Sequence, residues 1–180
     1  MRTNEGLWIA TVVTVLAMTG CAAQRAEGPL DVSLGLSRDE TAHALRRYDF
    51  CAQVEPARDH EVYPQCDHPG AGYGQAWVIA TYQGGRLARL QRFERWVDAA
   101  RAAERWNHLV EKRAATTPLS QDARDRIFAR QQIPERTRTW AAFRAGEHLV
   151  GVYLLTPATA EDPSILEEII PAAAPPPPPY

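Results

Sequence analysis

The sequence predicts an α+β fold, with an antiparallel sheet built from hairpins and helices packed on one face, in a single small domain. Two stretches alternate between apolar and polar residues on either side of a glycine-containing turn, the first at Gly84-Gly85 and the second at Ala145-Gly146. Before and between these stretches, apolar residues recur three and four positions apart, which is the spacing of amphipathic helices. Helix and hairpin therefore follow one another twice, as a weak internal repeat.

The chain has 180 residues and a formal net charge of −2. This nearly neutral balance gives no electrostatic reason to expect nucleic acid as a partner. We divide the chain into an export signal over 1–20, a tether over 21–29, a domain over 30–170 and a Pro-rich tail over 171–180. The domain is long enough to bury a core of its own.

The first 20 residues show the three zones of an export signal. Arg2 and the free amino terminus outweigh Glu5, and the run 7–18 is apolar. A membrane-spanning helix needs about 20 apolar residues, so this shorter run fits the hydrophobic zone of a signal better than a permanent span. It ends in Met18-Thr19-Gly20-Cys21, which resembles the lipobox of bacterial lipoproteins.

The lipobox resemblance implies cleavage after Gly20, a thioether-linked diacylglycerol on Cys21 and a fatty acid such as palmitate on its amine. Ala22 stands where a retained lipoprotein carries Asp, so the resemblance implies the outer membrane, with the domain facing the periplasm. The alternative is an ordinary secretory signal cleaved near Ala22-Ala23.

With Cys21 acylated, two cysteines remain, Cys51 and Cys66. An oxidising compartment favours a disulfide between them, which contributes about 3 kcal/mol by restricting the unfolded chain. The alternative is a metal site that combines both thiols with Asp67, His68 and His60, but no CxxC or paired-histidine spacing supports it. We therefore predict a disulfide, no metal and no cofactor.

The domain begins with an alternating stretch, Leu30 to Leu34, that predicts a half-buried strand ended by Gly35. Ser37 and Glu40 form a capping-box pattern, which predicts the start of a short amphipathic helix. The segment 50–73 contains several Pro and Gly and predicts a loop with two short strands at most.

A first hairpin is predicted from Trp77 to Phe93. A two-residue turn pairs Tyr82 with Leu87 and Ile79 with Leu90, and places four apolar side chains on the core side, namely Trp77, Ile79, Ala88 and Leu90. Helices are then predicted over 93–110 and 119–127.

A second hairpin is predicted from Thr137 to Thr156 around Ala145-Gly146, with Phe143 opposite His148 and Trp140 covering Gly151. Asp162-Pro163 is typical of a helix start, which predicts a last helix that ends at Pro171. The tail contains five consecutive prolines and predicts polyproline II, disordered unless it docks on an aromatic groove.

The stretch Leu34-Gly35-Leu36-Ser37-Arg38-Asp39-Glu40 passes from strand to capped helix just after the tether. It is similar to the opening of the small lipoproteins that accompany the outer-membrane β-barrel assembly machine. The later helix and hairpin arrangement resembles β-lactamase-inhibitor-like modules. Both families imply an α+β architecture with helices on one face of an antiparallel sheet, and only this architecture is carried over.

Residues with catalytic chemistry are sparse. Five histidines are scattered, and there is no GxSxG, HExxH or Gly-rich phosphate motif, so no catalytic residue is predicted. Glu167-Glu168 is interpreted as the solvated face of the last helix. Four arginines recur every third residue, and we interpret them as solvated rather than as a binding stripe: Arg86, Arg89, Arg92 and Arg95.

These patterns predict a lipid-anchored, non-catalytic scaffold or protein-binding module of the cell envelope, held at the membrane by its lipid and bound to an envelope protein. The alternative is a small-ligand carrier or minor enzyme with its site in the 51–73 loop, where His60, Tyr63 and His68 would converge.

Overall fold

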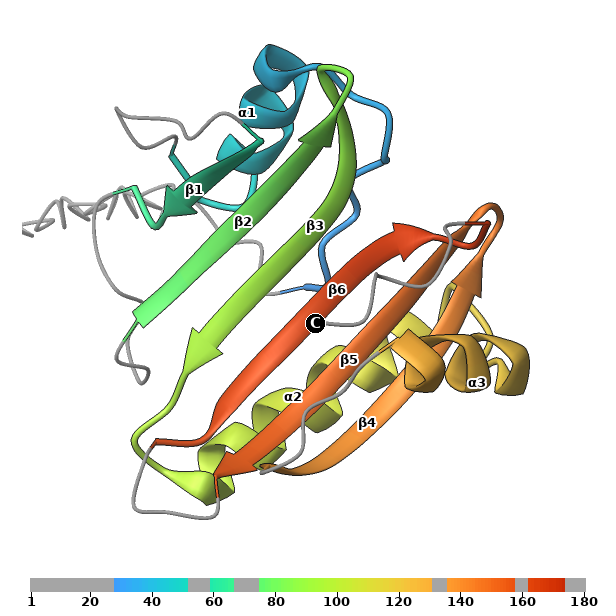
Figure 1. Cartoon of the computed structure of the whole chain (residues 1–180). Helices are drawn as coiled ribbons and strands as arrows, with labels where there is room; N and C mark the ends of the chain where they lie inside the picture. Colours follow the sequence, from blue (N-terminus) through green and yellow to red (C-terminus); the bar gives the residue numbers. More distant parts are fainter. Residues whose placement is uncertain (1–27, 52–58, 67–74, 131–135, 158–161, 174–180) are drawn as a thin grey trace, which may run out of the picture.

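The computed structural model describes residues 28–51, 59–66, 75–130, 136–157 and 162–173 (Figure 1). Its elements in chain order are α1 (Arg38–Arg46), β1 (His60–Pro64), β2 (Gln75–Gln83), β3 (Arg86–Arg95), α2 (Ala99–Ala114), α3 (Gln121–Arg130), β4 (Arg136–Ala145), β5 (His148–Pro157) and β6 (Ser164–Pro171). The strands form one six-stranded sheet in the order β1-β2-β3-β6-β5-β4, and every neighbouring pair is antiparallel. The predicted α+β class and single small domain are confirmed.

The two faces of the sheet are covered by different helices. The larger apolar cluster joins α1 and α2 to one face, here called the α1–α2 face, through Leu45 and Leu109. A second cluster joins α3 to the opposite face, here called the α3 face, through Ala123 and Ile127. In Figure 1, α2 passes behind β5 and β6, whereas α3 lies beside β4. The prediction that all helices pack on one face is therefore not confirmed.

Helix α1 starts as its capping box predicts. The Ser37 side chain accepts the backbone N–H of Glu40 at 3.3 Å, and the Glu40 carboxylate accepts the backbone N–H of Ser37 at 2.7 Å. Each contact satisfies a donor that the first helical turn leaves free. The buried side of the helix carries Thr41, Ala44 and Leu45, so the cap fixes which face meets the core.

The first hairpin forms around Gly84 and Gly85, whose φ values of 59° and 76° suit the tight turn. Tyr82 pairs with Leu87 as predicted, but a bulge between Thr81 and Tyr82 then shifts the register by one residue. The extra residue is in β3, and it puts Leu90 on the same face as Tyr82. Alternation along β2 places the predicted core residues Trp77 and Ile79 on the opposite, α3 face. The residues of β2 that reach the larger cluster instead are Ala76, Val78, Ala80 and Tyr82.

The helix predicted from Phe93 begins later. Strand β3 continues to Arg95 because β6 pairs along it, and α2 begins after the N-cap Asp98, whose carboxylate accepts the backbone N–H of Arg101 at 3.0 Å. Phe93 is therefore a strand residue that stacks on Trp77, with ring centroids 5.3 Å apart. The next predicted helix is present as α3.

The second hairpin turns one residue later than predicted. Ala145 pairs with His148, so Gly146 and Glu147 form the turn, and Gly146 has a φ of 58° at its first position. This is the glycine position of a type II′ turn. The pairing therefore places Tyr153 opposite Trp140, and Tyr153 rather than Trp140 lies against Gly151.

The helix predicted after Asp162-Pro163 is wrong, because these residues lead into β6. Its stretch Ile165 to Ile170 is buried on both sides, between β3 and β5. β-branched isoleucines suit such a strand, and pairing on both edges outweighs the local helix-start signal. The stretch Leu30 to Leu34 also differs from its prediction: Leu30 and Val32 are buried, but the segment lies over the α1–α2 face and does not join the sheet.

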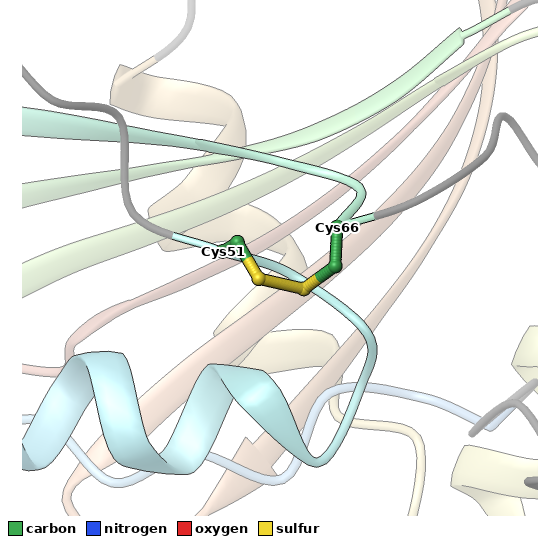
Figure 2. The surroundings of a disulfide bond; sticks show 2 residues. All are labelled: Cys51 and Cys66. Atoms are coloured by element: carbon green, nitrogen blue, oxygen red, sulfur yellow. A yellow bond between two sulfur atoms is a disulfide. The ribbon is translucent and has the colours of Figure 1, made fainter.

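The predicted disulfide is confirmed. Figure 2 shows Cys51, in the chain after α1, bonded to Cys66, in the chain after β1, with 4.9 Å between their Cα atoms. Backbone hydrogen bonds flank the bridge, from Cys51 to the Pro64 carbonyl and from Cys66 to the Asp49 carbonyl, each 2.9 Å long. Because both sulfurs are in the disulfide, neither is a thiolate that could bind a metal.

Candidate functional site: a buried clamp on the amino-terminal segment

The most unusual polar arrangement in the described structure surrounds Glu167, in the middle of β6. Its side chain is fully buried on the α1–α2 face. Both carboxylate oxygens accept the backbone N–H of Leu30, at 3.0 and 3.2 Å. The segment that enters the domain is thus bound by a carboxylate near the end of the chain.

Two arginines complete this arrangement. Arg113 of α2 donates from Nη2 to Glu167 and to the Leu30 carbonyl, each at 2.6 Å. Arg92 of β3, directly opposite Glu167 in the sheet, places its Nη2 2.9 Å from the carboxylate and donates from Nη1 to the Gly28 carbonyl at 3.0 Å. We call Arg92, Arg113 and Glu167 the clamp, because together they hold Gly28 and Leu30.

A second ion pair extends the clamp along β3. Arg105 of α2 binds Glu94 through two hydrogen bonds of 3.0 and 2.8 Å, and Arg92 Nε lies 3.4 Å from the same carboxylate. Burial raises the pKa of Glu94, but the charges of Arg92 and Arg105, with the hydrogen bond from Arg105, outweigh it and hold the pKa below its usual value. Glu94 is therefore ionised at neutral pH.

Spacing along α2 positions the two arginines. Arg105, Leu109 and Arg113 lie four residues apart, so they share one side of the helix. Leu109 is fully buried between them and fixes that side against the sheet. The whole group contains three guanidinium and two carboxylate groups. The guanidinium groups also donate to backbone carbonyls, from Arg92 Nη1 to Gly28 and from Arg113 Nη2 to Leu30.

The interpretation of Glu167-Glu168 as a solvated helix face is wrong, because strand alternation sends the two side chains into opposite faces. Glu168 is buried on the α3 face, where Arg89 Nε donates to it at 2.7 Å and Gln91 at 3.3 Å. The arginine stripe is also not uniformly solvated, since Arg92 is only 3 % exposed. The signal that was available is the pair of glutamates inside an otherwise apolar Ile-Leu-Glu-Glu-Ile-Ile run.

The ligand residues predicted in the 51–73 loop are divided between the two faces of β1. Tyr63 is fully buried on the α1–α2 face, and His60 lies on the other face, in a pair with Asp59 at 3.0 Å. The third candidate, His68, lies outside the described residues, as do Cys21, the signal over 1–20 and the tail from residue 174.

The Tyr63 hydroxyl belongs to a polar cluster centred on Glu61. This carboxylate accepts hydrogen bonds from Tyr63, from Tyr82 at 3.1 Å and from Arg38 at 2.6 Å. The Arg38 guanidinium also lies 4.4 Å from the centre of the Tyr82 ring. Burial, and then the hydrogen bond to Glu61, raise the pKa of Tyr63, so its phenol stays protonated. The cluster fastens α1 to β1 and β2.

Burial also acts on Glu61, whose pKa it raises, but the hydrogen bonds from Tyr63, Arg38 and Tyr82 outweigh it and lower the pKa below its usual value. The Glu61 carboxylate is therefore ionised at neutral pH and accepts hydrogen bonds from all three side chains.

Among the residues that the structure describes, no group of three or more His, Cys, Asp or Glu could hold a metal ion. No helix within these residues is long and apolar enough to cross a membrane.

Comparison with known proteins adds no relative: no protein-family profile, no curated protein and no solved structure matches the chain.

Proposed function

We propose that this chain is a lipid-anchored protein of the bacterial cell envelope, attached through Cys21 to the periplasmic side of the outer membrane. Its α+β domain then acts as a non-catalytic scaffold or protein-binding module. The observation that carries this proposal is the position of the clamp. It binds the backbone at Gly28 and Leu30, a few residues after the lipobox-like Met18 to Cys21.

Such a clamp suits an anchored domain. A tether that detaches from its domain lengthens the link between the lipid and the fold. The partly buried hydrogen bond to Gly28 and the buried hydrogen bond to Leu30 prevent this. The anchor is then coupled directly to the two middle strands, through Arg92 of β3 and Glu167 of β6. The Cys51–Cys66 disulfide supports the same compartment, because the periplasm is oxidising.

The binding role is favoured over catalysis because each buried carboxylate in the described part of the chain is already held by a cation. Glu94, Glu167 and Glu168 each have arginine partners, and the Tyr63 hydroxyl is bound by Glu61. The alternative of a ligand carrier or minor enzyme in the 51–73 loop requires His60 and Tyr63 to converge. Their placement on opposite faces of β1 does not support it.

The proposal is tested by expressing the full chain in a Gram-negative host that is fed an alkyne fatty acid. We expect the label on the protein, sedimentation with outer-membrane vesicles, and an intact mass that matches a triacylated chain beginning at Cys21. The matched control is Cys21→Ser, which should lose the label and stay unprocessed. An unlabelled chain cleaved near Ala22-Ala23, or an uncleaved leader, would contradict the proposal.

Proximity labelling from the anchored protein then tests the scaffold role. A photo-crosslinking residue at exposed Asp125 of α3 should capture a discrete set of envelope proteins from intact cells. The same residue in the Cys21→Ser chain is the control. Capture that does not depend on the anchor would count against a membrane-bound scaffold.

A further inference from the structure

We infer that the half of the α3 face formed by β1, β2 and β3 is the docking site for an amphipathic, acidic helix of a partner protein. Four apolar side chains on this half, here called the open patch, make the contact surface: Val62, Trp77, Ile79 and Phe93. This docking site rests on the proposed protein-binding role and specifies the chemistry of the partner segment.

The two halves of the α3 face carry matching aromatic pairs. Trp140 stacks on Tyr153 across β4 and β5, with ring centroids 5.9 Å apart. Trp77 stacks on Phe93 across β2 and β3, with ring centroids 5.3 Å apart. Both pairs belong to one row across the sheet, because Leu166 of β6 lies directly opposite Phe93 and Tyr153. The open patch is thus built like the half that α3 covers.

Helix α3 covers only one of these pairs. Its Ala123 and Ile127 are buried in the cluster that contains Tyr153, and Tyr153 is 1 % exposed. The helix contacts β4 and β5, at the end of the sheet away from β1 and β2 (Figure 1). The other two described helices pack on the α1–α2 face. The open patch stays partly exposed, whereas an apolar sheet face normally packs against another element.

The shape of the α3 face favours a helix over a membrane as the occupant. A helix with its side chains is about 10–12 Å across, so α3 stands higher than the neighbouring strands by about that distance. A flat bilayer that rests on α3 therefore does not reach the open patch. The strands β1 to β3 span two inter-strand spacings, about 10 Å in all. This width accommodates one further helix on the same face.

The charges beside the open patch favour an acidic partner. Arg95 is exposed, its guanidinium lies 5.9 Å from the centre of the Trp77 ring, and no carboxylate of the described residues pairs with it. On the same face, Arg89 is balanced by the buried Glu168. A carboxylate on the partner helix would pair with Arg95 beside the apolar contact. A second copy docked patch to patch would instead bring two Arg95 side chains together.

The test begins with a photo-crosslinking residue in place of Thr81, a partly exposed position of β2 on the α3 face. The full chain carries it in the envelope of its own host, and exposed Glu111 of α2 is the control position. Mass spectrometry identifies the crosslinked peptides. We expect adducts at Thr81, and not at Glu111, to map to one amphipathic, acidic segment of another protein. Adducts on lipid or on a second copy, or no adducts, overturn the inference.

An exchange of charges tests the contact itself. A synthetic peptide of the crosslinked segment is titrated against the purified full chain, its Arg95→Glu variant and the matched control Arg101→Glu, at an exposed position of α2. We expect Arg95→Glu to weaken binding about tenfold or more and to keep its thermal midpoint, and Arg101→Glu to change binding by less than about twofold. A peptide with lysine in place of one carboxylate should restore binding to Arg95→Glu. Equal losses in both variants, or no restoration by any such peptide, overturn the docking site.

The failures of the docking site and of the proposed function are distinguishable. The peptide titration is made in solution and does not depend on acyl chains, so a chain without acyl chains contradicts the lipid anchor alone. Envelope proteins captured at Asp125 of α3 but not at Thr81 contradict docking at the open patch alone.

Discussion

Glu167 and Leu30 are 137 positions apart, yet the carboxylate of one accepts the backbone N–H of the other at 3.0 Å in the buried interior. Strand β6 is the last strand that the structure describes and lies in the middle of the sheet, so the first described residues bind the last described strand. The domain is therefore closed by contacts between its two ends, and the amino-terminal segment depends on a strand that is synthesised last.

We expect the substitution Glu167→Gln in the clamp to lower the free energy of unfolding strongly. The amide keeps an acceptor for Leu30, but Arg92 and Arg113 then lose their shared negative partner inside the core. Breaking a buried pair by removing one partner costs about 3 kcal/mol or more. We expect the free energy of unfolding, measured by urea titration, to fall by about that amount, and the Leu30 amide to exchange faster with deuterium.

The matched control for this variant is Glu104→Gln, at an exposed position of α2. A solvated charge contributes little, so we expect a change within about 0.5 kcal/mol. Equal effects of the two substitutions would show that the clamp does not stabilise the fold.

We expect the contribution of Glu94 to the free energy of unfolding to decrease in acid. Its pKa in the folded protein is held below the ordinary 4.5 by Arg92 and Arg105. A lowered folded pKa gives stability that is fully present above the ordinary pKa and is lost as pH falls from that value through the lower folded pKa. The stability difference between the natural chain and Glu94→Gln should therefore be largest at neutral pH and shrink below about pH 4.5.

Urea titrations at several pH values between neutral and acid measure this difference, with Glu111→Gln at an exposed position of α2 as the control. The control should track the natural chain at every pH. A Glu94→Gln difference that grows on acidification would mean that the sign of the pKa shift is reversed.

The Cys51–Cys66 bridge closes a loop with a sequence separation of 15. A loop of that size restricts the unfolded chain by about 3 kcal/mol. We expect reduction with dithiothreitol, or the double substitution Cys51→Ser with Cys66→Ser, to lower the free energy of unfolding by about that amount. The serine variant should be insensitive to reductant. A fall in its free energy of unfolding on reduction, of the size seen in the natural chain, would point to another target of the reductant.

The Tyr153 ring leaves no room for a side chain at Gly151. A Cβ added at Gly151 would lie 2.5 Å from the Tyr153 hydroxyl and 2.7 Å from two ring carbons, and the ring is stacked on Trp140. Overpacking of this kind costs about 1–3 kcal/mol, so Gly151→Ala should lower the thermal midpoint.

A double-mutant cycle with Tyr153→Leu checks the cause. If the ring is the obstacle, Gly151→Ala should cost less than about 0.5 kcal/mol in the Tyr153→Leu background. An undiminished cost would assign the effect to the strand backbone at Gly151 instead.

The sequence alone determined the features that depend on residues close in the chain. The capping box of Ser37 and Glu40, the turn at Gly84-Gly85 and the pairing of Cys51 with Cys66 could all be predicted, because each needs only short-range chemistry or the compartment of the cell. The lipobox-like pattern around Cys21 is also local, and the lipid anchor that it indicates stays a prediction.

Tertiary structure decided the register and the role of the charges. A single bulge opposite Thr81 and Tyr82 moved Leu90 to the face opposite Trp77, and pairing on both edges made a strand of the residues around Glu167. Neither effect has a local signal, because a register is set by the partner strand and a buried carboxylate by cations from distant elements. Glu167 is stable inside the core only where β3 and α2 bring Arg92 and Arg113 to it.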